Sequence, residues 1–150
     1  MHIAPLPSGL LAAAVQLWST CGLTRPWNDP EADLSRALVG PSSRVLAAME
    51  DKELLGTVMV GHDGHRGWVY YLAVQPGRRG MGLGRELMLA AESWLDREGI
   101  PKLQLMVRGG NSEVIGFYER LGYVDQGVVV LGRFLDDELQ ALRERKSSSE

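Results

Sequence analysis

The chain has 150 residues, enough for one domain that buries most of the surface its unfolded form would expose. Apolar residues make up 45% and charged residues 23%, and the formal net charge of −3 provides no overall positive field for nucleic acid or an anionic membrane. The single cysteine, Cys21, excludes an intrachain disulfide and a thiolate-rich metal site, as is typical of a reducing cytoplasm. The longest apolar stretch near the N-terminus, residues 10–15, is far too short for a membrane span, and no charged leader frames it. We therefore expect a cytoplasmic protein.

Apolar periodicity and breaker residues predict an alternation of helices and strands. In chain order, we expect a short edge strand in residues 1–7, helices over 8–22 and 30–39, a hairpin of strands 43–50 and 54–62, a strand over 68–74, a helix over 83–98, a short buried strand over 102–107, a helix over 111–121 and one or two strands over 123–135. Pro5 and Pro7 limit the first strand to a sheet edge, and Ser8 is the expected N-cap of the first helix.

Neither an internal repeat nor a linker divides the chain. The elements predict one α/β domain over residues 1–135. The charged remainder, residues 136–150, is expected to be a helix or a disordered tail.

A turn dense in glycine and arginine, QPGRRGMGLGR, separates a strand from a helix at residues 75–85. Successive N–H groups in such a turn, together with the positive end of the helix dipole, can hold a phosphate. A P-loop is excluded because Leu83 and Gly84 stand where its lysine and hydroxyl are required. A dinucleotide-binding loop is disfavoured because Arg85 occupies its third glycine position. The remaining alternatives are a different anion loop and a surface turn without a ligand.

Residues 79–84 fit the pattern [Q/R]-x-x-G-x-[G/A] and resemble the pyrophosphate loop of the GNAT superfamily of N-acetyltransferases. The surrounding order also matches, with Leu72-Ala73-Val74 before the loop and a strand, Asn111 and the run FYERLGY after its helix. The resemblance covers residues 43–131, and the stretches RPWNDPE and GHDGHRG…YYL are similar to a bacterial subgroup, the YpeA-like acetyltransferases. It implies a mixed, twisted and splayed sheet of about six to seven strands flanked by about four helices.

The resemblance implies acetyl-CoA as co-substrate, an amine as acceptor and no metal. Leu72, Ala73 and Val74 would pair through their backbones with the pantetheine arm, as an added strand does. Asn111 would hydrogen-bond the same arm. The pyrophosphate would be held by Arg79, Gly80, Met81, Gly82, Leu83 and Gly84, with the side chains of Met81 and Leu83 facing the core.

Tyr118, in the FYERLGY run, stands where the family places a proton donor to the departing sulfur. With a phenol pKa near 10 and a thiol pKa near 8.5, full transfer is uphill by about 2 kcal/mol, which a hydrogen bond to the developing charge can offset. The alternative is an aromatic on the apolar stripe of its helix. The implied reaction is direct attack of a neutral amine in a ternary complex, and the alternative function is a catalytically silent acyl-CoA-binding module.

The general base is not evident, because Trp68 stands near the position at which some family members carry a carboxylate. His62, Asp63 and His65 lie just upstream and could act through water, or could organise their turn.

The acceptor site has two sets of candidates. Trp27, Asn28 and Asp29 offer an aromatic and an acid in a loop that borders the acceptor in GNAT folds, or Trp27 simply covers the core. Tyr70 and Tyr71 are expected on opposite faces of their strand, so that only one of them, such as Tyr70, lines the cleft. The acceptor, whether small molecule or protein, and the choice between monomer and homodimer stay open.

Overall fold

The computed structural model describes residues 1–149, with side chains up to Lys146. The described chain forms two compact units. The first contains Met1–Thr24 and Pro30–Met106, and the second contains Arg25–Asp29 and the chain from Val107 onward. Each unit is described by itself.

The first unit is built on a five-stranded sheet with the strand order β1-β2-β3-β4-β5. Its first three strand pairs are antiparallel, and the last, between β4 and β5, is parallel. The strands are β1 (His2–Pro5), β2 (Ser43–Glu50), β3 (Glu53–His62), β4 (Gly67–Val74) and β5 (Leu103–Gln104). The proline-bearing β1 lies at a sheet edge, as predicted, because proline lacks the N–H that an inner strand must donate.

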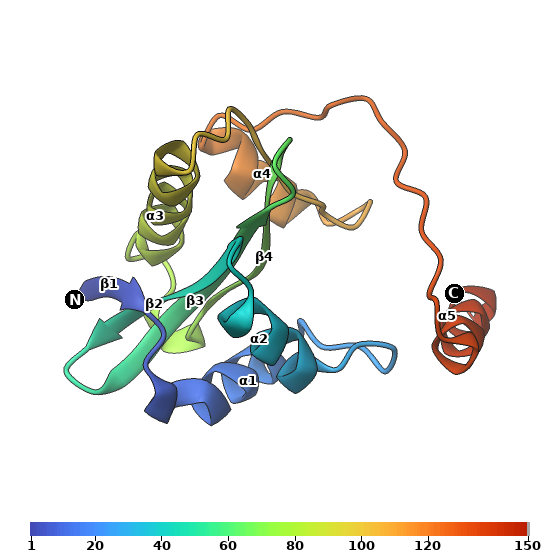
Figure 1. The fold of residues 1–150 in the computed structure, drawn as a ribbon, viewed down its shortest axis with the longest axis horizontal. Coiled ribbons are helices and arrows are strands. Elements are labelled where there is room, and N and C mark those ends of the chain that lie inside the picture. The colour runs from blue at the N-terminus through green and yellow to red at the C-terminus, as the bar shows by residue number, and fades with distance from the viewer. Residues whose placement is uncertain (150) are drawn as a thin grey trace. The chain divides into compact units, whose positions relative to one another are not determined.

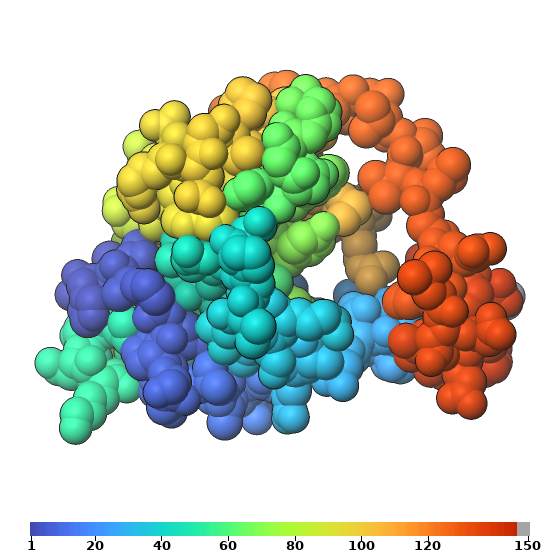
Figure 2. Space-filling view, in the orientation of Figure 1, coloured from blue at the N-terminus to red at the C-terminus, as the bar shows by residue number. Residues whose placement is uncertain are grey.

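Helices cover both faces of this sheet (Figure 1). One face carries α1 (Leu11–Thr20) and α2 (Pro30–Val39), and the other carries α3 (Leu83–Arg97). The space-filling view shows α1 and α2 as one continuous surface (Figure 2). One side of α3 is buried, and Ala90 is half-buried; the buried residues are Leu83, Leu87, Met88, Ala91, Trp94 and Leu95. Two short 3-10 helices, η1 (Ser8–Leu10) and η2 (Pro76–Arg78), precede α1 and the glycine-rich turn.

Strand β4 contains one extra residue opposite β3. Thr57 pairs with Ala73 but Met59 pairs with Tyr70, so a bulge lies between these two pairs. Tyr71 adopts a φ of 53°, in the left-handed region. Tyr71 therefore packs against the core under α1, while Tyr70 lines a groove at the α2–β2 connection on the same side. The expectation that the two tyrosines face opposite sides was wrong, because the bulge shifts the alternation by one residue.

The second unit contains the helices α4 (Ser112–Arg120) and α5 (Asp137–Ser149). The Asn111 side chain caps α4 by accepting the Val114 N–H at 3.4 Å. Gly122, with a φ of 97°, ends the helix, and the Tyr123 N–H donates to the Tyr118 carbonyl at 3.0 Å. Both signals are readable in the sequence. Of the charged segment predicted over 136–150, Asp137–Ser149 is helical, and Glu150 lies outside the described residues.

The mixed α/β fold class is confirmed, with five strands and five α-helices among the described residues. The strands predicted over 123–135 are absent, because a strand needs a neighbouring strand for its N–H and C=O groups and the described part of the second unit offers only helices. The strand predicted over 102–107 is reduced to Leu103–Gln104, and its residues are partly rather than fully buried. Ser8 begins η1 rather than capping α1, whose N-cap is Leu10.

Candidate active site

The turn between β4 and α3 is shaped by two glycines with positive φ, Gly80 at 82° and Gly82 at 80°. A Cβ at either position would meet no atom within 4 Å, so the backbone conformation rather than crowding requires glycine. Gly82 is the N-cap of α3 and carries no capping side chain, and the helical hydrogen bonds begin with the Glu86 N–H on the Gly82 carbonyl. The N–H groups of residues 83–85 therefore precede the helical ladder. This open, donor-rich turn at a helix N-terminus fits a pyrophosphate.

The two arginines before this turn have different neighbours. Arg78 lies 3.7 Å from a Glu50 oxygen and 3.3 Å from a Glu53 oxygen, and so holds the turn against the β2–β3 hairpin. Arg79 instead points its Nη2 to the Cys21 sulfur at 3.5 Å. Among the described residues, carboxylates therefore pair with the guanidinium of Arg78 but not with that of Arg79.

The side chains inside the turn correct one expectation. Leu83 is 6% exposed and joins the core, but Met81 is 64% exposed. Met81 sits between the two left-handed glycines, at the tip of the turn, so it cannot reach the core.

The edge of β4 that faces away from β3 has a partner strand only at its first two residues. The pairing between β4 and β5 covers only Gly67 and Trp68. No other strand in the described first unit lies beside Leu72–Val74 on that side, whereas Ala73 and Val74 pair with β3 on the inner side. An extended ligand could add to this edge through backbone hydrogen bonds, which fits a pantetheine arm leading away from the glycine turn.

Cys21 lies between these two features. Its thiol donates to the Val74 carbonyl at 3.4 Å and accepts from Arg79. In the sequence, Cys21 lies 53 positions before Val74, outside the strands that carry the motifs. No local pattern indicates this proximity, which results from α1 packing on the sheet.

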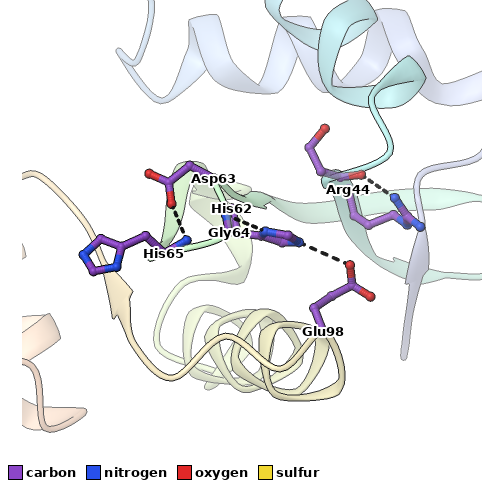
Figure 3. Close-up of polar contacts among 7 residues, drawn as sticks. Arg44, His62, Asp63, Gly64, His65 and Glu98 are labelled. Atoms are coloured by element: carbon purple, nitrogen blue, oxygen red, sulfur yellow. Dashed lines mark hydrogen bonds and ion pairs between the residues drawn. The ribbon is translucent and has the colours of Figure 1, made fainter.

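The turn that joins β3 to β4 holds three candidate bases (Figure 3). Asp63 Oδ1 accepts the N–H groups of His65 and Arg66, both at 2.8 Å, and these hydrogen bonds lower the pKa of the Asp63 carboxyl. His62 Nδ1 accepts the Gly64 N–H at 3.1 Å, and its Nε2 lies 3.3 Å from a Glu98 oxygen. His62 and Asp63 thus organise the turn, as the second of the two sequence interpretations proposed.

A groove of about 350 Å³ lies beside the bulged part of β4. Trp68 and Tyr70 of β4 and Met59 of β3 line it together with the α2–β2 connection, residues 40–43. Tyr70 is 46% exposed, and burial of its ring raises the pKa of its phenol. Sequence reasoning selected Tyr70 but missed Trp68 and Met59, whose shared face follows only from the register of β3 on β4.

Tyr118 and Asn111 belong to the second unit. Burial raises the pKa of Tyr118 to about 12, above the value near 10 assumed from the sequence. Its ring makes edge contacts with Phe117 and Tyr123, at centroid distances of 5.0 and 5.9 Å. The phenol therefore stays protonated at physiological pH and can act as a hydrogen-bond donor.

Trp27 also belongs to the second unit, and it is 6% exposed. The Arg143 guanidinium lies 5.1 Å from its ring centroid. This burial favours the second of the two sequence interpretations, in which Trp27 is a packing residue. Asn28 and Asp29 remain exposed.

Two searches of the described residues concern other classes of site. No group of three or more His, Cys, Asp or Glu side chains among residues 1–149 is arranged to hold a metal ion. Within the same part of the chain, each helix is too short or too polar to cross a bilayer.

A layered sheet with a glycine turn at a helix N-terminus and an open strand edge can hold a ligand that has a phosphate group and an extended arm. Comparison with known proteins identifies the family: the sequence profile described as "Acetyltransferase (GNAT) family" matches residues 12–123. An acetyltransferase of Pectobacterium atrosepticum is 46% identical over 123 residues, which is 82% of this chain and 87% of that protein. This chain belongs to the GNAT acetyltransferase family.

Solved structures show the same fold at low sequence identity. A transcriptional regulator from Bacillus halodurans is 18% identical with a TM-score of 0.77, and the match covers 89% of this chain and 99% of that one. An aminoglycoside acetyltransferase, AAC(6')-Iy, in complex with a CoA-containing bisubstrate analogue, is 17% identical with a TM-score of 0.76, covering 90% and 98%.

Proposed function

We propose that this acetyltransferase moves an acetyl group from acetyl-CoA to a primary amine by direct attack within a ternary complex. One observation carries the proposal: the open turn at Gly80 and Gly82 leads directly to an unpaired strand edge. An anion cradle followed by such an edge suits a ligand that has a pyrophosphate and an extended amide-bearing arm.

The cofactor-binding roles follow from that geometry. Arg79, Gly80, Met81, Gly82, Leu83 and Gly84 hold the pyrophosphate, mainly through backbone N–H groups and the α3 dipole. Leu72, Ala73 and Val74 align the pantetheine arm by strand addition, and Asn111 adds a side-chain hydrogen bond to that arm. When bound, acetyl-CoA supplies an acetyl group activated as a thioester.

Tyr118 donates a hydrogen bond to the sulfur as negative charge develops there. A phenol with a pKa of about 12 is too weak an acid to give up its proton completely to a thiolate, so its contribution is stabilisation of that charge. The acceptor must arrive as a neutral amine, because His62 and Asp63 are engaged by their own turn. The rate should therefore follow the fraction of acceptor that is unprotonated.

A catalytically silent acyl-CoA-binding module is the second candidate. It would use the same turn and strand edge but would have no need of Tyr118. A nucleotide- or NAD-binding role is disfavoured by Leu83 and Arg85, which replace residues that those loops require. Cytoplasmic location, a single domain over 1–135 and the YpeA-like subgroup stay predictions.

An acceptor screen with acetyl-CoA, read by release of free thiol, tests the proposal directly. We expect thiol release that depends on both acetyl-CoA and an amine. Thermal shifts with acetyl-CoA, ATP and NAD measured in parallel identify the ligand, because only a molecule that binds the folded state raises the melting temperature. Stabilisation by acetyl-CoA without turnover on any amine would favour the silent module. Stabilisation by ATP or NAD alone would reject both acyl-CoA hypotheses.

A further inference from the structure

The groove beside the β4 bulge has one rigid wall and one aromatic wall. The rigid wall is the connection between α2 and β2: the His62 N–H donates to the Ser42 carbonyl at 2.9 Å, and Ser43 Oγ donates to the Ala37 carbonyl at 2.8 Å. A Cβ on Gly61 would lie 3.1 Å from the Ser42 carbonyl oxygen, so β3 and this connection are already in close contact. The groove is therefore preformed rather than opened by a mobile loop.

Trp68 and Tyr70 form the aromatic wall. The register of β4 on β3 sets Trp68 opposite Gly61 and Tyr70 opposite Met59. Together with Met59, these rings give the groove a surface that is largely apolar.

The two titratable side chains of the β3–β4 turn that line the groove, His62 and Asp63, already have partners. The Asp63 carboxylate accepts the backbone N–H of His65 (Figure 3) and that of Arg66. His62 uses Nδ1 for Gly64 and turns Nε2 toward Glu98. Among the residues that line the groove, Asp63 is the only acid, and its position offers no cluster of negative charge to a polycation.

We propose that this groove binds the acceptor substrate of the acetyl transfer, and that the preferred acceptors are monoamines with an aromatic or aliphatic group next to the amine. The inference rests on the proposed function, because it uses the position of Tyr70 beside Leu72–Val74, where the pantetheine arm ends. The apolar group of the acceptor packs between Trp68, Tyr70 and Met59, and the amine points along β4 toward the bulge. Polyamines and aminoglycosides fit poorly, since their several charges would lose water without gaining carboxylate partners.

Two matched amines test the proposal: 2-phenylethylamine, which has one charge and one ring, and spermidine, which is polycationic. We expect kcat/KM for 2-phenylethylamine to exceed that for spermidine by about tenfold or more, which corresponds to one buried apolar group. Trp68→Ala should raise the KM for 2-phenylethylamine by a similar factor and leave the KM for acetyl-CoA unchanged. A preference for spermidine, or a Trp68→Ala variant with unchanged acceptor KM, would overturn the inference.

Two variants at Tyr70 test whether a negative charge in the groove shifts the preference toward polyamines. Tyr70→Asp places a carboxylate in the groove, and Tyr70→Asn is the uncharged control of the same size. We expect the ratio of spermidine to 2-phenylethylamine turnover to rise in Tyr70→Asp relative to Tyr70→Asn. Equal ratios in the two variants would contradict a groove that contacts the acceptor.

Direct binding separates this inference from the proposed function. Calorimetric titration of the CoA-saturated protein with each amine measures acceptor affinity without any turnover. The proposed chemistry fails if no amine of the acceptor screen releases thiol. The groove assignment holds if 2-phenylethylamine binds more tightly than spermidine and loses affinity in Trp68→Ala. The assignment is rejected if spermidine binds as tightly or if Trp68→Ala binds 2-phenylethylamine as tightly as the parent does.

Discussion

Trp18 of α1 and Tyr71 of β4 stack with their ring centroids 3.9 Å apart and their planes inclined by only 13°. The Tyr71 hydroxyl donates to Asp33 of α2 at 2.7 Å, and the Trp18 Nε1–H donates to the Thr57 hydroxyl at 2.8 Å. Tyr71 is also the residue whose left-handed backbone forms the bulge of β4. The stack therefore anchors the irregularity of the strand to the two helices above it.

The Thr57 hydroxyl links Trp18 to the backbone of Tyr71, and removing this hydroxyl tests whether it holds the bulge. The side chain is fully buried, and its Oγ1 donates to the Tyr71 carbonyl at 2.9 Å while accepting from Trp18. Thr57→Val keeps the shape but leaves the Trp18 N–H and the Tyr71 carbonyl without this partner, so we expect a loss of about 1–3 kcal/mol in the free energy of unfolding. Urea denaturation measures the loss, and Thr57→Ser, which keeps the hydroxyl, should recover most of it. A Thr57→Val variant as stable as the parent would show that the hydroxyl does not hold the bulge.

The β3–β4 turn is expected to be structural and not catalytic. Asp63→Asn keeps an oxygen acceptor but removes the charge, so kcat should stay unchanged while the melting temperature falls at neutral pH. The hydrogen bonds from His65 and Arg66 lower the pKa of Asp63, so the ionised form stabilises the fold above the unfolded pKa near 4, and this benefit is lost as the pH falls through the lower folded value. The difference in melting temperature between parent and variant should therefore shrink in acid. A large fall in kcat instead would identify Asp63 as the base.

Direct attack by the amine predicts that Cys21 never carries the acetyl group. Cys21→Ala should keep turnover, and stopped-flow measurement with acetyl-CoA but no amine should show no burst of free thiol. A burst equal to the enzyme concentration that disappears in Cys21→Ala would instead establish an acyl-enzyme on this thiol. The variant also removes the contacts of the sulfur with Val74 and Arg79, so its KM for acetyl-CoA should be recorded alongside.

Several elements were predictable because their signals are local. Pro30 in the first turn and Gly40 after the last one bound α2, and the strands on either side of Asp51 and Lys52 form the expected hairpin. The glycine turn was predictable for the same reason, since its conformation depends on residues within a single hexapeptide. Asn111 and Gly122 likewise mark the two ends of α4 in the sequence itself.

Features that depend on packing were not predictable. Two adjacent tyrosines look like ordinary alternating strand residues, and only the pairing with Thr57 and Met59 reveals the bulge between them. The valine-rich run at 128–130 has high strand propensity, but propensity supplies no partner strand, and these side chains are exposed. Trp68 was considered only for the acid that it replaces, so its place in the groove was missed.

Tyr118 is predicted to stabilise the departing thiolate. Tyr118→Phe should lower kcat by about 100-fold and leave the affinity for acetyl-CoA unchanged, because the ring and its packing remain. The neighbouring Tyr123, which contacts the Tyr118 ring, provides the control: Tyr123→Phe should keep full turnover. Turnover of Tyr118→Phe at the parental rate, with chemistry rate-limiting, would leave Tyr118 with a packing role alone.

The raised pKa of Tyr118 adds a pH test. Because the folded phenol holds its proton to about pH 12, the rate profile between pH 7 and 10 should keep its shape in Tyr118→Phe and only be scaled down. The unfolded phenol ionises near pH 10, so the parent should lose stability as the pH rises from about 10 to 12, and Tyr118→Phe should lose less. Melting temperatures of the parent and of Tyr118→Phe, measured across this pH range, check whether the parent loses more stability.

The central claim is that the turn at Gly80–Gly84 binds the pyrophosphate of acetyl-CoA, and calorimetric titration of two Gly82 variants tests it most directly. Gly82→Asp and Gly82→Asn have the same size and share a cost of about 1 kcal/mol for the positive φ, so they differ in charge alone. We predict that Gly82→Asp binds acetyl-CoA about 100-fold or more weakly than Gly82→Asn, because a carboxylate then faces the pyrophosphate, while both variants unfold cooperatively. Equal acetyl-CoA affinities in the two folded variants would contradict the assignment of this turn.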